Sequence, residues 1–102
     1  MRTFTLAAAA CAAVAVLAAG PAHAQQAQYI AANCANCHGT DGRSAGGGGM
    51  PGIAGLSPTY FKEQMKAFRE GTRKATIMHQ IAKGYTDEQI AALADYFSQQ
   101  KK

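Results

Sequence analysis

The feature that most constrains this chain is the segment Cys34-Ala35-Asn36-Cys37-His38. Two cysteines separated by two residues, with a histidine directly after the second, form the attachment pattern of a c-type haem. Two intervening residues let the backbone turn once, so that both thiols reach vinyl groups on adjacent pyrrole rings. The next residue then projects under the iron, where an imidazole is a good ligand. The pattern predicts one haem, bound covalently through Cys34 and Cys37 and ligated by His38.

Residues 1–24 are typical of a cleaved secretory signal. Arg2 supplies a positive start, residues 4–19 are almost wholly apolar, and Ala22-His23-Ala24 fits a small-residue cleavage site. A retained membrane anchor is the alternative, but this run is short and rich in alanine, whereas a spanning helix needs about 20 apolar residues. We therefore expect a periplasmic protein without a permanent membrane anchor, in which residues 25–102 form a single domain.

The expected mature chain is small. Cleavage after Ala24 would leave 78 of the 102 residues and, with the loss of Arg2, would lower the net charge from +4 to +3. A chain of this size usually needs a disulfide, a metal or a cofactor to support its small core, and a covalent haem would serve. The mild positive charge, without a basic stripe interleaved with aromatic residues, does not indicate nucleic-acid binding.

Capping signals predict an all-α fold. Ser57-Pro58 is a helix start, because serine caps a helix and proline suits its first position, and Gly71 is a helix end. Thr86 and Gln89 form a capping box at the start of a last helix. No alternating strand pattern is visible. We expect three main helices and one or two short ones around the haem, with helical segments at residues 25–33, 58–70, 77–84 and from 87 onward.

Apolar periodicity predicts the buried faces of the two longest helices. Phe61, Met65 and Phe68 fall at positions i, i+4 and i+7, which form one helical face. In the last helix a similar face carries Ile90, Leu93, Ala94 and Phe97. Both faces are predicted to lie in the core.

A low-spin electron carrier needs a second axial ligand, and a methionine thioether would raise the reduction potential. Met50 is only twelve residues beyond His38, in a glycine-rich loop expected on the histidine side, and Met65 belongs to an apolar helical stripe. Met78 is forty residues beyond His38, enough chain to return on the opposite face, and we predict that it binds the iron. His79 is the competitor, but its side chain points about 100° away from that of Met78 on a helix, so we expect it at the surface or at a haem propionate.

The proximal histidine also needs a partner for its second ring nitrogen, because that contact orients the ring and raises its basicity. The carbonyl of Pro51 is the predicted acceptor, since the proline ring holds the local backbone. Ile53 is expected to pack on the haem.

Several segments together resemble a class I cytochrome c, most closely the haem subunits of flavocytochrome c sulfide dehydrogenases. The resemblance lies in Cys-Ala-Asn-Cys-His-Gly-Thr-Asp-Gly at 34–42, Pro-Gly-Ile-Ala-Gly-Leu-Ser-Pro-Thr-Tyr-Phe at 51–61, Met-Lys-Ala-Phe-Arg-Glu-Gly-Thr-Arg at 65–73, and the run at 75–97. It implies covalent haem at Cys34 and Cys37, iron ligation by His38 and Met78, and an FAD-containing partner that oxidises sulfide. Electrons would pass from sulfide to flavin, to this haem, and then to another cytochrome. Many relatives carry two haem domains, whereas this chain has one haem motif.

Other functions remain open at this stage. A free periplasmic carrier that feeds a terminal oxidase or another reductase is the main alternative, and a ring of cations at the haem edge would favour it. A haem enzyme or sensor would need an open iron position, and no catalytic residue is predicted. A thiol oxidoreductase would need a βαβ pattern, and a zinc site would need further ligands. The candidate cations are Lys62, Lys66, Arg69, Arg73 and Lys74.

Overall fold

The computed structural model describes residues 22–45 and 50–102, and within them all regular secondary structure is helical. In chain order the elements are α2 (Ala22–Ala32), α3 (Ala35–His38), the 3₁₀ turn η1 (Thr40–Gly42), α4 (Pro58–Glu70), α5 (Met78–Ala82) and α6 (Asp87–Ser98). Three longer helices and two short α-helices confirm the predicted all-α architecture. Most of the predicted signal segment, residues 1–21, lies outside the described residues, and so does the glycine run at 46–49.

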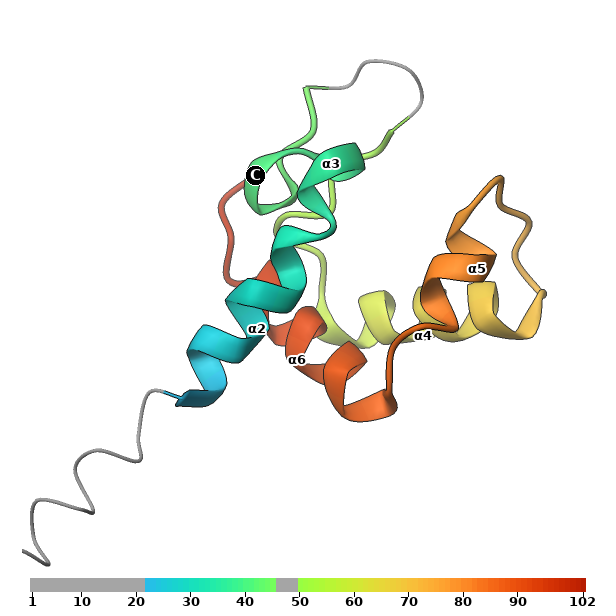
Figure 1. Cartoon of the computed structure of the whole chain (residues 1–102). Coiled ribbons are helices and arrows are strands. Elements are labelled where there is room, and N and C mark those ends of the chain that lie inside the picture. The colour runs from blue at the N-terminus through green and yellow to red at the C-terminus, as the bar shows by residue number, and fades with distance from the viewer. Residues whose placement is uncertain (1–21, 46–49) are drawn as a thin grey trace, which may run out of the picture.

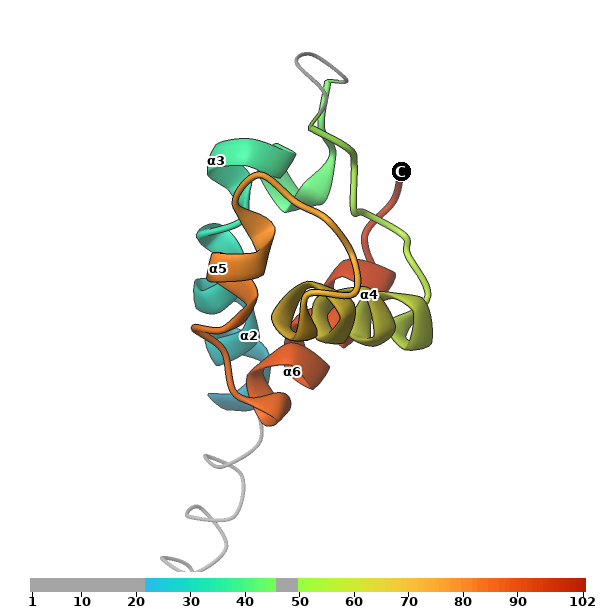
Figure 2. The ribbon, with the colours of Figure 1, turned by 90° about the vertical axis from the view of Figure 1, so that its right-hand side faces the viewer.

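Helix α6 is the centre of the fold, because it packs against both α2 and α4, while α5 packs against α4 (Figure 1). The loop of residues 71–77 leaves the end of α4 and arches back to α5, on the level of α3 (Figure 2). In Figure 1, α3 and α5 stand apart from each other, and α4 runs below them. No helix within the described ranges is long and apolar enough to cross a membrane.

Small side chains allow α2 and α6 to approach closely. Ala27 and Ala31 on α2 are buried, and Ala94 on α6 is fully buried. The core cluster includes Ala31, and Ile30 packs against this cluster at partial burial. Its C-terminal end delivers the chain directly to the cysteine motif.

The predicted caps are present. The Ser57 hydroxyl accepts a hydrogen bond from the Tyr60 amide at 3.1 Å, and Gly71 ends α4 in the left-handed conformation at φ +81°. At the start of α6, the Thr86 hydroxyl accepts from the Gln89 amide at 3.1 Å, and the Gln89 side chain accepts from the Thr86 amide at 2.9 Å. These contacts satisfy amides that the first turn of a helix leaves without partners.

The core joins α4 and α6. Phe61 and Phe97 stack with their ring centroids 5.7 Å apart, and Leu93 is fully buried beside them. Burial of the predicted face of α6 is confirmed, as is that of Phe61 and Met65 on α4, while Phe68 is only partly buried.

Candidate haem site

A cavity of about 500 Å³ lies between α3, α4 and α5, within the usual range for a small-molecule site. All six residues predicted to bind the cofactor line it: Cys34, Cys37, His38, Pro51, Ile53 and Met78. Most of the remaining wall comes from α4, the loop of residues 73–77 and the segment before α4. The fold thus brings together residues that are up to 44 positions apart in the chain.

The two thiols and the imidazole are held on one helical turn. Cys34 precedes α3, and its carbonyl accepts hydrogen bonds from the amides of Cys37 at 3.3 Å and His38 at 2.9 Å. Cys34 is half-buried and Cys37 is exposed. Burial raises the pKa of the Cys34 thiol, and the neighbouring Cys37 raises this pKa further. A redox-active cysteine needs the opposite, a depressed pKa, so the environment of Cys34 disfavours a thiol oxidoreductase.

The proximal histidine is oriented by a backbone carbonyl. Nδ1 of His38 lies 2.7 Å from the carbonyl oxygen of Pro51, at the geometry of a strong hydrogen bond. Because a carbonyl can only accept, Nδ1 must carry the proton, which leaves the lone pair on Nε2 free for a metal. The contact expected between His38 and Pro51 is therefore present.

A close approach at Gly42 fixes the loop that carries Pro51. The Gly42 carbonyl accepts hydrogen bonds from the amides of Ile53 at 2.8 Å and Ala54 at 3.1 Å. Gly42 has φ +79°, and a Cβ atom there would lie 2.7 Å from Cγ1 of Ile53 and 3.0 Å from Cδ1 of Phe97. The position therefore requires glycine for both conformation and space.

Three methionines reach the cavity wall. Met50 adjoins Pro51 on the histidine side and is 42% exposed, whereas Met65 is buried in the face of α4. Met78 is the first residue of α5, is half-buried, and lines the same cavity as His38. Its ligation of the iron remains a prediction.

His79 does not line the cavity. It is half-buried, and its Nδ1 atom is buried without a hydrogen-bond partner in the described part of the chain. The expectation of a surface or propionate-contacting side chain is neither confirmed nor contradicted by this partial burial and stays a prediction. The turn of α5 points His79 away from the wall that Met78 occupies, as the helical period requires.

The five candidate cations do not form one ring. Lys62, Lys66 and Arg69 line a different hollow of about 540 Å³ between α4 and the start of α6. Arg73 and Lys74 line the cavity itself. Arg73 is held in place, because its Nη1 donates to Oε1 of Gln64 at 2.5 Å and its Cζ lies 4.6 Å from the centroid of the Phe68 ring.

Sequence reasoning missed part of the wall. The face of α4 that was predicted as core, with Phe61, Met65 and Phe68, also borders the cavity, and Gln64 borders it as well. The same helical spacing could have suggested this, since Gln64 is a polar residue beside an apolar stripe. Tyr60 on α4 also borders the cavity and was not predicted to do so. The other unpredicted contributors come from other parts of the chain: Asn33, Gly52, Leu56, Ala75, Thr76, Ile77, Ile81, Tyr85 and Leu93.

These residues fit a covalently bound haem. Two thiols one turn apart suit two vinyl groups, an imidazole with Nδ1 occupied offers Nε2 to iron, and the Met78 thioether lines the same cavity. The apolar wall suits a porphyrin face. Arg73 and Lys74 suit its carboxylates, because a guanidinium has five N–H donors and Gln64 engages only one atom of Arg73.

The comparisons with known proteins agree with this site. Residues 22–101 match the family model described as cytochrome c. The chain is 42% identical over 48 residues to the "Cytochrome subunit of sulfide dehydrogenase" of Chlorobaculum tepidum, which covers 47% of this chain and 44% of that protein. It is 44% identical over 50 residues to "Cytochrome c-554(548)" of Halomonas halodenitrificans, covering 46% and 60%. The matched segments thus span about half the length of these relatives.

The fold and the site define a small all-α haem protein that transfers electrons. The chain belongs to the cytochrome c family, whose members bind haem c covalently.

Proposed function

We propose that this protein is the electron-transfer subunit of a sulfide dehydrogenase, with a single haem c. It would accept electrons from an FAD-containing flavoprotein that oxidises sulfide and pass them to another cytochrome in the periplasm. The observation that carries the proposal is the likeness to a relative named as the cytochrome subunit of sulfide dehydrogenase. The single Cys-x-x-Cys-His motif supports one haem.

In this proposal the haem supplies one-electron exchange at iron, and the protein sets the conditions for it. Cys34 and Cys37 would hold the ring by thioethers, and His38 and Met78 would ligate the iron. With both ligands supplied by the protein, the metal would not be free to bind a substrate, so sulfide chemistry would be left to the partner. The hydrogen bond from His38 to Pro51 holds the imidazole in one orientation.

Ligation by Met78 is tested on the exported, haem-loaded protein. The Fe(III) form should show a weak absorption band at about 695 nm, which marks methionine ligation. Met78→Leu should abolish this band. Met50→Leu and Met65→Leu are matched controls, because both side chains also line the cavity, and both variants should keep it. A band that survives Met78→Leu would overturn the assignment and reopen the possibility of a haem sensor or enzyme.

Covalent attachment and export are tested together by mass. The mature protein should have the mass of residues 25–102 plus one haem, and its pyridine haemochrome spectrum should be that of a haem with two saturated vinyl positions. A mass without haem would refute the proposed haem attachment. A mass that still includes residues 1–24 would contradict the predicted cleavage.

The partner is tested by reduction kinetics. Haem reduction should follow when sulfide and a flavoprotein sulfide dehydrogenase subunit are added together, and not when either is added alone. The two proteins should also co-purify. Failure of both experiments would refute the subunit role while leaving the family assignment intact.

A free periplasmic carrier that serves an oxidase or another reductase is the second candidate. It is favoured by the cations at the cavity, Arg73 and Lys74, since charged rims support transient docking. The relative named cytochrome c-554(548) supports it as well, because that name specifies no enzyme complex. This candidate predicts a protein that purifies alone and whose reduction rate by its donor falls steeply with added salt.

A further inference from the structure

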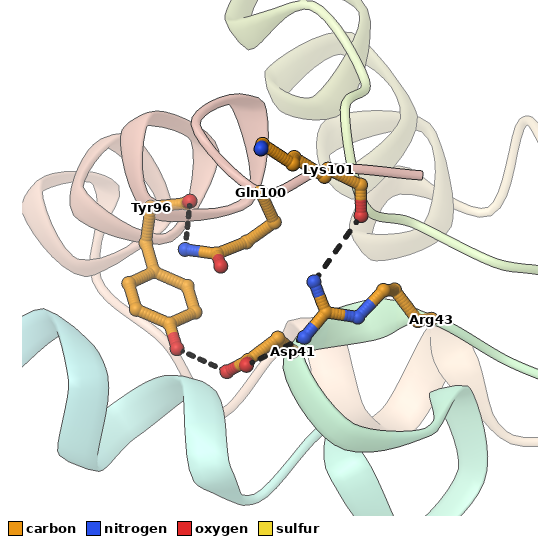
Figure 3. A network of polar contacts seen from close by, with 5 residues as sticks. All are labelled: Asp41, Arg43, Tyr96, Gln100 and Lys101. Atoms are coloured by element: carbon orange, nitrogen blue, oxygen red, sulfur yellow. Dashed lines mark hydrogen bonds and ion pairs between the residues drawn. The ribbon is translucent and has the colours of Figure 1, made fainter.

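Polar contacts tie the turn after the haem motif to the end of the chain (Figure 3). Asp41 Oδ1 accepts from the Tyr96 hydroxyl at 2.5 Å, and Oδ2 accepts from Nη2 of Arg43 at 3.2 Å. Arg43 Nη1 also donates to the Lys101 carbonyl at 3.4 Å. Gln100 Nε2 donates to the Tyr96 carbonyl at 3.0 Å. Asp41 thus joins the haem-motif turn to α6, although 55 residues separate it from Tyr96.

The contacts of Asp41 support an uncommon backbone conformation. Its φ of +52° lies in the left-handed region, and within residues 22–45 and 50–102 it is the only non-glycine residue with a positive φ. Aspartate adopts this region more readily than most residues with a Cβ atom, but less readily than glycine, so the contacts of its side chain help to stabilise it. The Arg43 pair is largely exposed, at 45% and 34% of the two side chains, and contributes little. The Tyr96 hydroxyl is part-buried, and its short bond is the stronger constraint.

The next residue connects this turn to the proximal ligand. The Gly42 carbonyl holds the amides of Ile53 and Ala54, and the Gly55 amide donates to the Phe97 carbonyl at 2.8 Å. The loop at 51–55 is therefore attached to α6 twice, once directly through Phe97 and once through the turn that Tyr96 holds. At the start of this loop lies the Pro51 carbonyl that accepts from His38.

We propose that Tyr96 is a positioning residue for the iron ligand. Its hydrogen bond to Asp41 fixes the Gly42 carbonyl, and through the loop it keeps the Pro51 carbonyl against Nδ1 of His38. This rests on the proposed ligation of iron by His38. A firm hydrogen bond from Nδ1 makes the imidazole more basic and stabilises Fe(III). Removal of the Tyr96 hydroxyl relaxes the turn, weakens that bond and raises the reduction potential.

The test compares the haem-loaded wild type with Tyr96→Phe. Phenylalanine keeps the ring and its edge-on contact with Phe97, in which the centroids are 5.2 Å apart, so packing is preserved. Two quantities are measured: the midpoint potential by spectroelectrochemistry, and the solvent exchange of the His38 Nδ1 proton by NMR. The variant should show a more positive potential and faster exchange. A potential and an exchange rate both equal to those of the wild type would overturn the proposal.

Thr86→Ala is the matched control, because it loosens the same helix at its other end and touches none of the contacts to Asp41. It should lower the unfolding midpoint and leave both quantities unchanged. Equal shifts in Thr86→Ala and Tyr96→Phe would mean that general loosening of α6 is responsible, and would refute a positioning role. A wild type without covalent haem would refute the proposed function itself, whereas a normal wild type with an unaffected Tyr96→Phe refutes only this inference.

Discussion

Gly42 offers a quantitative test of how the haem-motif turn is held. It has nearly the same positive φ as Gly71, +79° against +81°. The surroundings differ, because a Cβ atom at Gly42 would lie 2.7 Å from Ile53 Cγ1 and 2.9 Å from the Ala54 amide nitrogen, whereas at Gly71 it would meet nothing within 4 Å. The two glycines therefore separate the cost of conformation from the cost of a clash.

The expected magnitudes follow from these two terms. Placing alanine in a left-handed conformation costs about 1–2 kcal/mol at either site. Gly42→Ala adds an overpacking cost of about 1–3 kcal/mol, because the Cβ atom meets backbone and core atoms that cannot move aside freely. The free energy of unfolding should thus fall by about 2–5 kcal/mol for Gly42→Ala and about 1–2 kcal/mol for Gly71→Ala. A domain of this size has roughly 4–12 kcal/mol in total.

Urea unfolding of the haem-loaded protein, followed by far-UV circular dichroism and haem absorbance, measures the difference. The midpoint of Gly42→Ala should lie below that of Gly71→Ala by roughly 1 M or more, with similar slopes. In Gly42→Ala the band at about 695 nm should persist, since the distortion is on the histidine side of the iron. Equal midpoints for the two variants would show that the turn yields to a methyl group and would refute the argument from close contact.

Three further predictions concern α6. Leu93→Ala should reduce the free energy of unfolding by about 2–5 kcal/mol, measured in urea, because the side chain is fully buried. Thr86→Ala should reduce the free energy of unfolding by about 0.5–2 kcal/mol through loss of the capping box. Thr86→Ser should reduce it much less, because serine can form the same cap. The hydrogen bond to Asp41, and secondarily burial, raises the pKa of Tyr96 above the ordinary value of 10.0. The folded state therefore holds the Tyr96 proton more tightly than the unfolded state does. The contribution of this proton to the free energy of unfolding is complete below about pH 10 and is lost as pH rises through the raised pKa. The free energy of unfolding should therefore depend less on pH above about pH 10 in Tyr96→Phe than in the wild type.

Local signals predicted the elements well where the chemistry is local. A serine before proline, a glycine after the last apolar position and a Thr-x-x-Gln box act within four residues, and each is found as a cap at its predicted place. The cysteine motif acts within five residues, and its helical turn is present as well. The hydrogen bond between His38 and the Pro51 carbonyl could be predicted from the sequence because proline restricts its own backbone.

Local sequence patterns could not predict features that depend on long-range packing. The spacing of the apolar residues on α4 predicts a buried core face. Only the position of α5 in the folded protein shows that part of this face borders the cavity. The five cations share one stretch of sequence, but the helical turn and the following loop send them to two different surfaces. The partly buried position of His79 depends in the same way on how α5 lies against α4.

The residues that would attach and ligate the haem are specified by short patterns, because thioether formation and axial ligation need particular atoms at particular spacings. The surroundings of those residues depend on the assembled fold. The bond between Tyr96 and Asp41 spans 55 positions, and Met78 lines the same cavity as His38 only because α4 and α6 pack as they do. Chain entropy makes such contacts unpredictable from local propensity, since they form only when the whole core closes.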